Sequence, residues 1–306
     1  MKIIETVREM EAERARLPGS AGLVPTMGAL HEGHLSLVRR ARADNDFAVV
    51  SIFVNPTQFG PNEDYQSYPR DRERDLALLE AEGVDVVFMP GEEEMYPPGF
   101  DEWVEVPGPL TSRLEGVARP GHFRGVATVV ARLFRIVRPQ RAYFGQKDAQ
   151  QVRVIRRMVS DLGLPVEIVP MPIVRDADGL ALSSRNAYLS PAERRAALVL
   201  PRALDLVRMM ALGWGIREAD LLRESLEDYI RQVPQVRLDY VSIADEETLE
   251  ELHDTIERPA LVLLAARVGT TRLIDNTVII TEGADVPEAL RDIVGDIAAG
   301  RSRRSP

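Results

Sequence analysis

Short apolar runs alternate with segments of helical periodicity through the first 175 residues of the chain. The apolar runs are nearly continuous, which is typical of parallel strands whose two faces are both covered. These predicted strands span residues 21–27, 47–55, 84–90, 141–145 and 166–174. Between them, apolar residues recur every three or four positions, which predicts helices around residues 35–41, 76–81, 126–137 and 152–159. This alternation predicts an α/β domain with a Rossmann-like, doubly wound parallel sheet.

The pattern changes after Arg175, where a polar, turn-rich segment begins. Ser190, Pro191 and Glu193 have the spacing of an N-cap, a first-turn proline and a capping box, so a helix is expected to follow. Further elements are predicted as helices over about 191–212 and 217–232 and strands over 237–245, 259–269 and 271–280. We therefore predict three parts: a Rossmann-like domain at 1–175, a smaller α+β lid domain at 176–282, and a helix or tail at 283–306.

Composition narrows the class of protein without deciding its chemistry. The 306 residues include no cysteine, which excludes disulfides, a thiolate nucleophile and a zinc site built on cysteine. No apolar run reaches the ~18 residues of a membrane span, and the charged N-terminal segment is unlike a secretory signal, so we expect a cytoplasmic protein with no membrane partner. The net charge of −10 argues against a nucleic-acid partner, but it is compatible with a small anionic substrate.

Lysine is almost absent from the chain, which makes the few that occur informative. Lys2 and Lys147 are the two lysines among 38 lysines and arginines. A lysine ammonium is a compact point charge, whereas a guanidinium is a wide planar fork, so a tight phosphate pocket can require the lysine. Lys147 is therefore a candidate phosphate ligand, with chance retention as the alternative.

Two histidines follow the first long apolar run at the point where a helix is expected to begin. His31 and His34 are three residues apart, which places them on one face of a helix, and Gly33 leaves room for a ligand against the backbone. The N-terminus of a helix attracts phosphate. A metal site would need a third ligand and normally an i, i+4 pair, and a packed or capping role is the other alternative. The pattern favours phosphate binding.

Five segments in this order and spacing resemble a known family. H-x-G-H after a strand is similar to the HIGH motif of a nucleotidyltransferase superfamily. The whole set resembles the pantoate–β-alanine ligases over about residues 1–282, and it reads "PTMGALHEGHLSLVRRA", "SIFVNPTQFGPNEDYQSYPR", "GHFRGVATVV", "YFGQKDAQQ" and "ALSSRNAYLS". The resemblance implies that ATP and pantoate bind the domain at 1–175 and form pantoyl adenylate and pyrophosphate, and that β-alanine then displaces AMP to give pantothenate. It also implies Mg²⁺ as a cofactor and a homodimer.

The resemblance, together with the local patterns, nominates the site residues. Catalytic roles are expected for His34, His31, Lys147, Ser183 and Arg185, because each can stabilise the phosphates that leave. Contacts to ATP are expected from Met27, Gly28, Ala29, Leu30, His31, Glu32, Gly33, His34, Gly145, Gln146, Lys147, Asp148, Val174, Leu182, Ser183, Ser184 and Arg185. Contacts to pantoate or β-alanine are expected from Gln58, Gln151, Met27, Arg119 and His122.

Alternatives stay open for several of these residues. Gln58 can be an ordinary solvated loop residue, Asp148 can cap a helix instead of orienting ribose, and the segment 182–185 can be a plain domain linker. The position that matches the family's magnesium ligand is Asp75, but Arg74 replaces an acid often found beside it, and a charged helix face explains Asp75 equally well. Two other functions compete with a ligase: a nucleotidyltransferase that stops after one transfer, and a non-catalytic ATP sensor.

Overall fold

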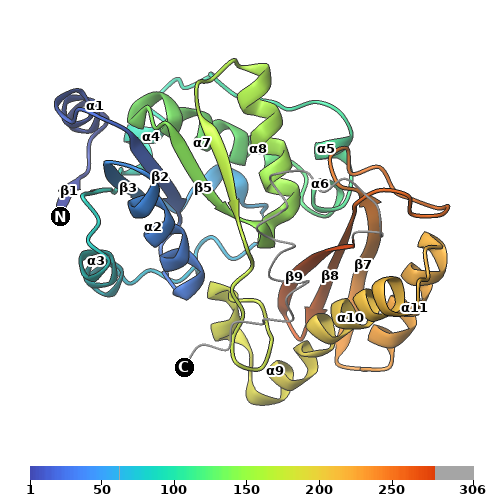
Figure 1. Cartoon of the computed structure of the whole chain (residues 1–306). Coiled ribbons are helices and arrows are strands. Elements are labelled where there is room, and N and C mark those ends of the chain that lie inside the picture. The colour runs from blue at the N-terminus through green and yellow to red at the C-terminus, as the bar shows by residue number, and fades with distance from the viewer. Residues whose placement is uncertain (62, 280–306) are drawn as a thin grey trace. The chain divides into compact units, whose positions relative to one another are not determined.

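The computed structural model describes residues 1–61 and 63–279. The chain divides into two compact units, Met1–Met171 and Pro172–Pro306 (Figure 1). The sequence pattern placed this division near Arg175. The helix or tail predicted over 283–306 lies outside the described residues.

The first unit is a six-stranded parallel sheet with the strand order β1-β4-β3-β2-β5-β6. Its strands are β1 (Lys2–Ile4), β2 (Ala21–Thr26), β3 (Phe47–Ile52), β4 (Val86–Phe88), β5 (Arg141–Gly145) and β6 (Glu167–Met171). Its helices are α1 (Val7–Arg16), α2 (Glu32–Asp44), η1 (Pro56–Gln58), α3 (Arg72–Ala81), α4 (Glu92–Met95), α5 (Pro109–Ser112), α6 (Glu115–Ala118), α7 (His122–Val137), η2 (Gln146–Asp148) and α8 (Ala149–Asp161). The predicted doubly wound parallel sheet is confirmed.

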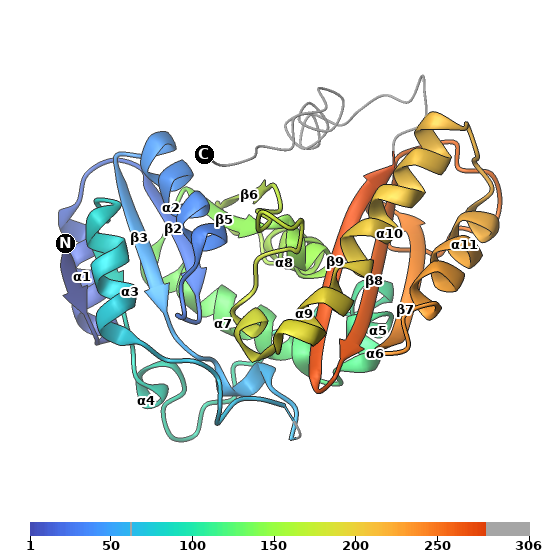
Figure 2. The same ribbon diagram turned by 90° about the horizontal axis from the view of Figure 1, so that it is seen from below.

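Successive strand residues point to opposite faces of this sheet and meet different helices. On one face, Leu23 and Val49 belong to a core that includes side chains of α1, α7 and α8. On the other face, Val24 and Val50 pack with side chains of α2 and α3. Figure 2 shows α2 and α7 on opposite sides of β2 and β3. Because both faces are covered, the strands are apolar at nearly every position.

The strand β1 is the element of this sheet that the sequence pattern missed. It pairs with β4 from Lys2 to Ile4, and Ile4 is its one buried residue. A three-residue edge strand with one buried side chain has no apolar run to reveal it, because its hydrogen bonds to β4 define it.

The chain reverses its winding between β2 and β5. The helix α2, which links β2 to β3, packs on one face of the sheet, whereas α8, which links β5 to β6, packs on the other. In open parallel sheets, ligands bind beyond the carboxyl ends of the strands at such a switch point. The segments that follow β2, β3 and β5 are therefore where a site is expected.

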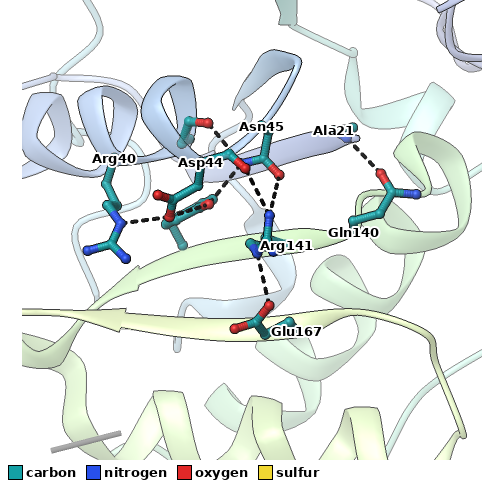
Figure 3. Close-up of polar contacts among 9 residues, drawn as sticks. Ala21, Arg40, Asp44, Asn45, Gln140, Arg141 and Glu167 are labelled. Atoms are coloured by element: carbon teal, nitrogen blue, oxygen red, sulfur yellow. Dashed lines mark hydrogen bonds and ion pairs between the residues drawn. The ribbon is translucent and has the colours of Figure 1, made fainter. Parts of the chain in front are cut away.

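Polar side chains link neighbouring elements at the opposite end of the sheet, where the strands begin (Figure 3). Arg141 donates its Nε hydrogen to Glu167 Oε2 at 2.9 Å and its Nη1 hydrogen to the backbone oxygen of Asp44 at 2.9 Å. Gln140 Oε1 accepts the backbone N–H of Ala21 at 2.6 Å. These contacts join the C-terminal end of α2 to the beginnings of β2, β5 and β6.

The second unit packs helices on a three-stranded antiparallel sheet of order β7-β8-β9. Its elements are η3 (Ser184–Tyr188), α9 (Pro191–Ala197), α10 (Val199–Arg208), η4 (Met209–Gly213), α11 (Ala219–Arg231), β7 (Val236–Asp245), β8 (Ala260–Val268) and β9 (Thr271–Ile279). Figure 2 shows α10 and α11 along one face of these strands, and their apolar side chains share one core. The predicted capping box is present: Ser190 Oγ accepts the Glu193 N–H at 3.3 Å, and Glu193 Oε2 accepts the Ser190 N–H at 2.9 Å.

The lengths of the helices can be compared with the length that a membrane-spanning helix requires. The helix α7 has 16 residues. Within residues 1–61 and 63–279, no helix combines the length and apolar character that crossing a bilayer requires.

Candidate active site

The turn that follows β2 has a left-handed backbone at two consecutive residues. Gly28 has φ +82° and Ala29 has φ +51°. This conformation costs a residue with a Cβ about 1–2 kcal/mol, so surrounding contacts must hold it. Asp75 from α3 supplies them: its Oδ2 accepts the Ala29 N–H and its Oδ1 accepts the Leu30 N–H, both at 2.8 Å. Burial raises the pKa of Asp75, against the two N–H donors, which lower it.

The two histidines lie directly after this turn, at the beginning of α2. Their ring centroids are 4.1 Å apart, and the His31 backbone N–H is directed at His34 Nδ1 at 3.4 Å. Burial, His31 and Lys147 lower the pKa of His34 to about 3, so its ring is neutral near pH 7. With Nδ1 as the acceptor, the ring hydrogen is on Nε2, which is the group left to donate. Glu32, which follows His31 in the sequence, ion-pairs with Arg39 at the surface.

The turn after β5 repeats this strand-to-helix arrangement with a lysine. Gly145 ends the strand, and Lys147 lies in η2 just before α8. The positive charge of Lys147 acts on His34, so the two turns meet beside the switch point, as neighbouring strands require. A Cβ on Gly145 would meet no atom within 4 Å, so there is open space next to this turn. Gln146 is buried. The Asp148 side chain makes no hydrogen bond that caps α8, so the structure does not show the capping role that the sequence left open.

The segment after β3 directs a glutamine toward the first turn. Asn55 is 1% exposed, and its Nδ2 donates to Gln58 Oε1 at 3.0 Å. The Gln58 Nε2 group lies 3.2 Å from Met27 Sδ. The structure therefore brings together two residues that the sequence assigned to substrate binding. Gln151, another residue assigned to substrate binding, lies half-buried in the first turn of α8.

A glycine that the sequence analysis did not single out makes this arrangement possible. Gly125 of α7 lies against η1 so closely that a Cβ on it would be 2.3 Å from the Thr57 oxygen and 2.7 Å from the Gln58 nitrogen. Such distances are far inside van der Waals contact. The only sequence signal was a glycine inside a strongly helical, apolar segment, which often marks close backbone approach.

Arg119 and His122 hold the Gln58 loop in this structure. Arg119 donates from Nε and Nη2 to the two carboxylate oxygens of Glu63, both at 2.7 Å. Its Nη1 hydrogen is directed at His122 Nε2 at 3.0 Å, which leaves the His122 Nδ1 hydrogen for the backbone oxygen of Gln58 at 2.9 Å. The sequence predicted both residues as substrate ligands. Their partners here are Glu63, which sequence reasoning missed, and the loop itself.

The remaining predicted residues lie in the second unit. Leu182 donates its N–H to the Val174 oxygen at 3.0 Å, and Ser183 Oγ caps η3 by accepting the Arg185 N–H at 3.3 Å. The same segment is anchored by Arg175, which makes a two-pronged ion pair with Asp275 at 2.7 and 2.9 Å. Ser184 begins η3. A role for these residues toward the phosphates stays a prediction.

Asp75 does not fit the magnesium site that the sequence assigned to it. Asp75 is 2% exposed, and both of its oxygens accept backbone N–H groups. A cationic group, Arg74 Nη1, lies 4.0 Å from Asp75 Oδ1. Among the residues that the structure describes, no cluster of three or more histidine, aspartate or glutamate side chains could hold a metal ion.

Two buried histidines predict that the protein loses stability in mild acid. The pKa of His34 is lowered to about 3, and burial and Arg119 lower that of His122 to about 4, from an ordinary value near 6.5. Below pH 6.5 the unfolded chain therefore binds protons that the folded chain does not, and the free energy of unfolding falls as the pH drops from 6.5 toward 4. Urea unfolding at pH 7.5 and pH 5 measures this difference.

A variant and a control assign the effect to the buried rings. We expect His122→Gln to reduce the difference in unfolding free energy between the two pH values. The exposed His253 provides the matched control, His253→Gln. An unchanged pH dependence in His122→Gln would contradict the assignment.

Comparisons with known proteins show the family to which the chain belongs. Residues 2–278 match the model of the pantoate-beta-alanine ligase family. A pantothenate synthetase of Roseiflexus sp. (strain RS-1) is 62% identical over 279 residues, which are 91% of this chain and 99% of that protein. This chain belongs to the pantoate-beta-alanine ligase family. Membership makes it a ligase that joins pantoate to β-alanine, as the five sequence segments predicted.

Solved structures of the family have the same fold. The crystal structure of pantothenate synthetase from Thermus thermophilus superimposes with a TM-score of 0.86 at 56% identity, covering 90% of this chain and 99% of that one. The pantoate-beta-alanine ligase of Francisella tularensis has a TM-score of 0.75 at 35% identity, covering 91% and 97%. That structure is a complex with beta-gamma ATP and beta-alanine.

Proposed function

We propose that the protein ligates pantoate to β-alanine in two steps, through pantoyl adenylate. The observation that carries this proposal is the convergence of a neutral His34 and Lys147 at the switch point of the sheet. The ligands of the Francisella tularensis relative support ATP and β-alanine as substrates of this chain. A transfer that stopped after one step would give no reason for Gln58 and Gln151, and an ATP sensor would need no group at the reacting phosphate.

In the first step, a carboxylate oxygen of pantoate attacks the α-phosphorus of ATP, and the bond to the pyrophosphate oxygen breaks. Negative charge moves onto the leaving phosphates. The Lys147 ammonium and the Nε2–H of His34 stabilise that charge without forming a covalent bond. Ser183 and Arg185 are expected to supply further donors to the β- and γ-phosphates.

In the second step, the amine of β-alanine attacks the acyl carbon of the adenylate, and AMP leaves with the bonding electrons. The Gln58 amide both donates and accepts hydrogen bonds, so it suits the hydroxyl and carboxylate groups of pantoate beside Met27. Gln151 provides a second amide. Mg²⁺, a homodimer and a cytoplasmic location stay predictions from the sequence.

The decisive experiment follows AMP and pyrophosphate with purified protein. We expect AMP to form only when ATP, pantoate and β-alanine are all present. Exchange of labelled pyrophosphate into ATP should need pantoate alone, because the adenylate forms before β-alanine reacts. Pyrophosphate release without pantoate, or no AMP with all three substrates, would rule out the proposal.

The close contact between α7 and η1 predicts a selective binding defect in Gly125→Ala. The added methyl group has no room beside Thr57 and Gln58, so the backbone must move and carry the Gln58 amide with it. We expect the KM for pantoate to rise about tenfold, with a smaller change for ATP. Steady-state kinetics measure both. Gly91→Ala is the matched control, because a Cβ there meets no atom within 4 Å; an unchanged KM in Gly125→Ala would contradict the role given to Gln58.

A further inference from the structure

The carboxylate of Asp75 contacts the turn that carries the two histidines. It lies in α3, yet it accepts N–H bonds from Ala29 and Leu30, which are 46 and 45 residues away in sequence. The bonds are equal in length, 2.8 Å, and one carboxylate oxygen serves each. Such a carboxylate fixes the direction of two successive peptide groups, and therefore the path of the chain into His31.

The turn needs such a contact because its backbone is unfavourable. Ala29 has φ +51°, in the left-handed region that a residue with a Cβ rarely adopts. The preceding Gly28 is also left-handed, and a Cβ on it would lie 3.0 Å from Asp75 Oδ2. The absence of a Cβ at position 28 therefore leaves space that the Asp75 carboxylate occupies.

The same contacts argue against a metal on this carboxylate. Asp75 is 2% exposed, its oxygens face N–H donors, and its near neighbour Arg74 is positively charged. Mg²⁺ in nucleotide sites keeps several water molecules and binds through exposed carboxylates and substrate phosphates. A carboxylate that is buried and accepts a peptide N–H on each oxygen leaves no space for a hydrated cation.

We propose that Asp75 is a positioning residue: it holds the left-handed turn 28–30 and thereby places His31 and His34 at the reacting phosphate, and it does not ligate the divalent cation. The inference rests on the proposed adenylation for its kinetic consequence. The contact itself is independent of that reaction.

The first test compares Asp75→Asn with the matched change Glu80→Gln on the same helix. Asparagine keeps one acceptor but turns an NH₂ group toward the second peptide N–H, so the turn loses its support. Glu80 is exposed. We expect Asp75→Asn to lower kcat for AMP formation about tenfold while the Mg²⁺ concentration for half-maximal activity stays unchanged, and Glu80→Gln to behave as the wild type.

A second substitution distinguishes positioning from a general loss of structure. Glycine adopts φ +51° without strain, so Ala29→Gly should restore activity to Asp75→Asn by a larger factor than it alters the wild type. Equal factors in the two backgrounds would overturn the proposal. So would wild-type kcat in Asp75→Asn, or a tenfold rise in half-saturating Mg²⁺ with full activity recovered at high Mg²⁺.

A measurement on the wild-type protein needs neither turnover nor a folded variant. Mn²⁺ is added without ATP, and the amide NMR signals of Ala29 and Leu30 are followed. A metal on Asp75 would broaden both signals strongly, which would overturn the proposal; we expect them to persist. Because this readout does not depend on adenylation, it tests Asp75 even if the assay for AMP shows that the proposed function is wrong.

Discussion

Replacing His34 with alanine is expected to lower the rate of pantoyl adenylate formation by about 10²-fold or more, the usual cost of losing one donor to transition-state charge. The structure makes His34 a neutral donor. Its pKa is lowered to about 3, and the His31 N–H occupies Nδ1, so Nε2 carries the hydrogen. A neutral donor stabilises the leaving phosphates without first requiring a proton from solvent.

Pyrophosphate exchange into ATP with pantoate alone measures this step without the second. The matched variant is His34→Gln, whose amide nitrogen reaches the region of Nε2 and keeps one donor. We expect it to retain several times the rate of His34→Ala. A rate close to wild type in His34→Ala would show that the histidine is not at the reacting phosphate.

Replacing Lys147 with alanine is expected to reduce adenylation by a similar factor, about 10²-fold. A point charge next to the leaving phosphates is lost, and so is a positive neighbour of His34. Because Lys147 contributes to the lowered pKa of His34, the pKa of that ring should rise in the variant. One substitution thus has a kinetic and a spectroscopic consequence.

The imidazole of His34 can be titrated by NMR, and exchange kinetics give the rate. Lys147→Arg restores the charge but not the shape, so we expect it to keep less than about a tenth of the wild-type rate. Lys2 provides the control: it lies on β1 and pairs with Glu13, so Lys2→Arg should leave both readouts unchanged. Full activity in Lys147→Arg would mean that only net charge matters at this position.

The sequence was sufficient to predict the elements that bury many apolar side chains. Apolar residues are nearly continuous in β3 and periodic in α7, so the local sequence alone indicates that both elements are buried. β1 is different, because its three residues depend on pairing with Val86–Phe88 for their conformation. Likewise, the single helix predicted over 191–212 is divided at Leu198 into α9 and α10, a local break that periodicity does not reveal.

The same distinction applies to the site. The motifs at the ends of β2 and β5 were found because a strand, a glycine and a helix start are local signals. Contacts between distant segments left no such signal: Glu63 meets Arg119 across 56 residues, and Asp75 meets Leu30 across 45. Asp75 was assigned to magnesium because its position matches the metal ligand of the family that the sequence resembles, whereas its partners in the structure are backbone N–H groups.

The helix α2 extends from the carboxyl ends of the parallel strands to their amino ends. Its 13 residues span about 20 Å, with the histidines at one end and Asp44 at the other, where Arg141 holds its backbone. Gly22 has no side chain to keep the helix away from β2, since a Cβ there would lie 3.2 Å from the Ala41 Cβ. We therefore expect that a change in the Arg141 contacts would shift the N-terminal end of α2 and with it the two imidazoles. The orientation of the histidines would then depend in part on contacts at the opposite end of the sheet.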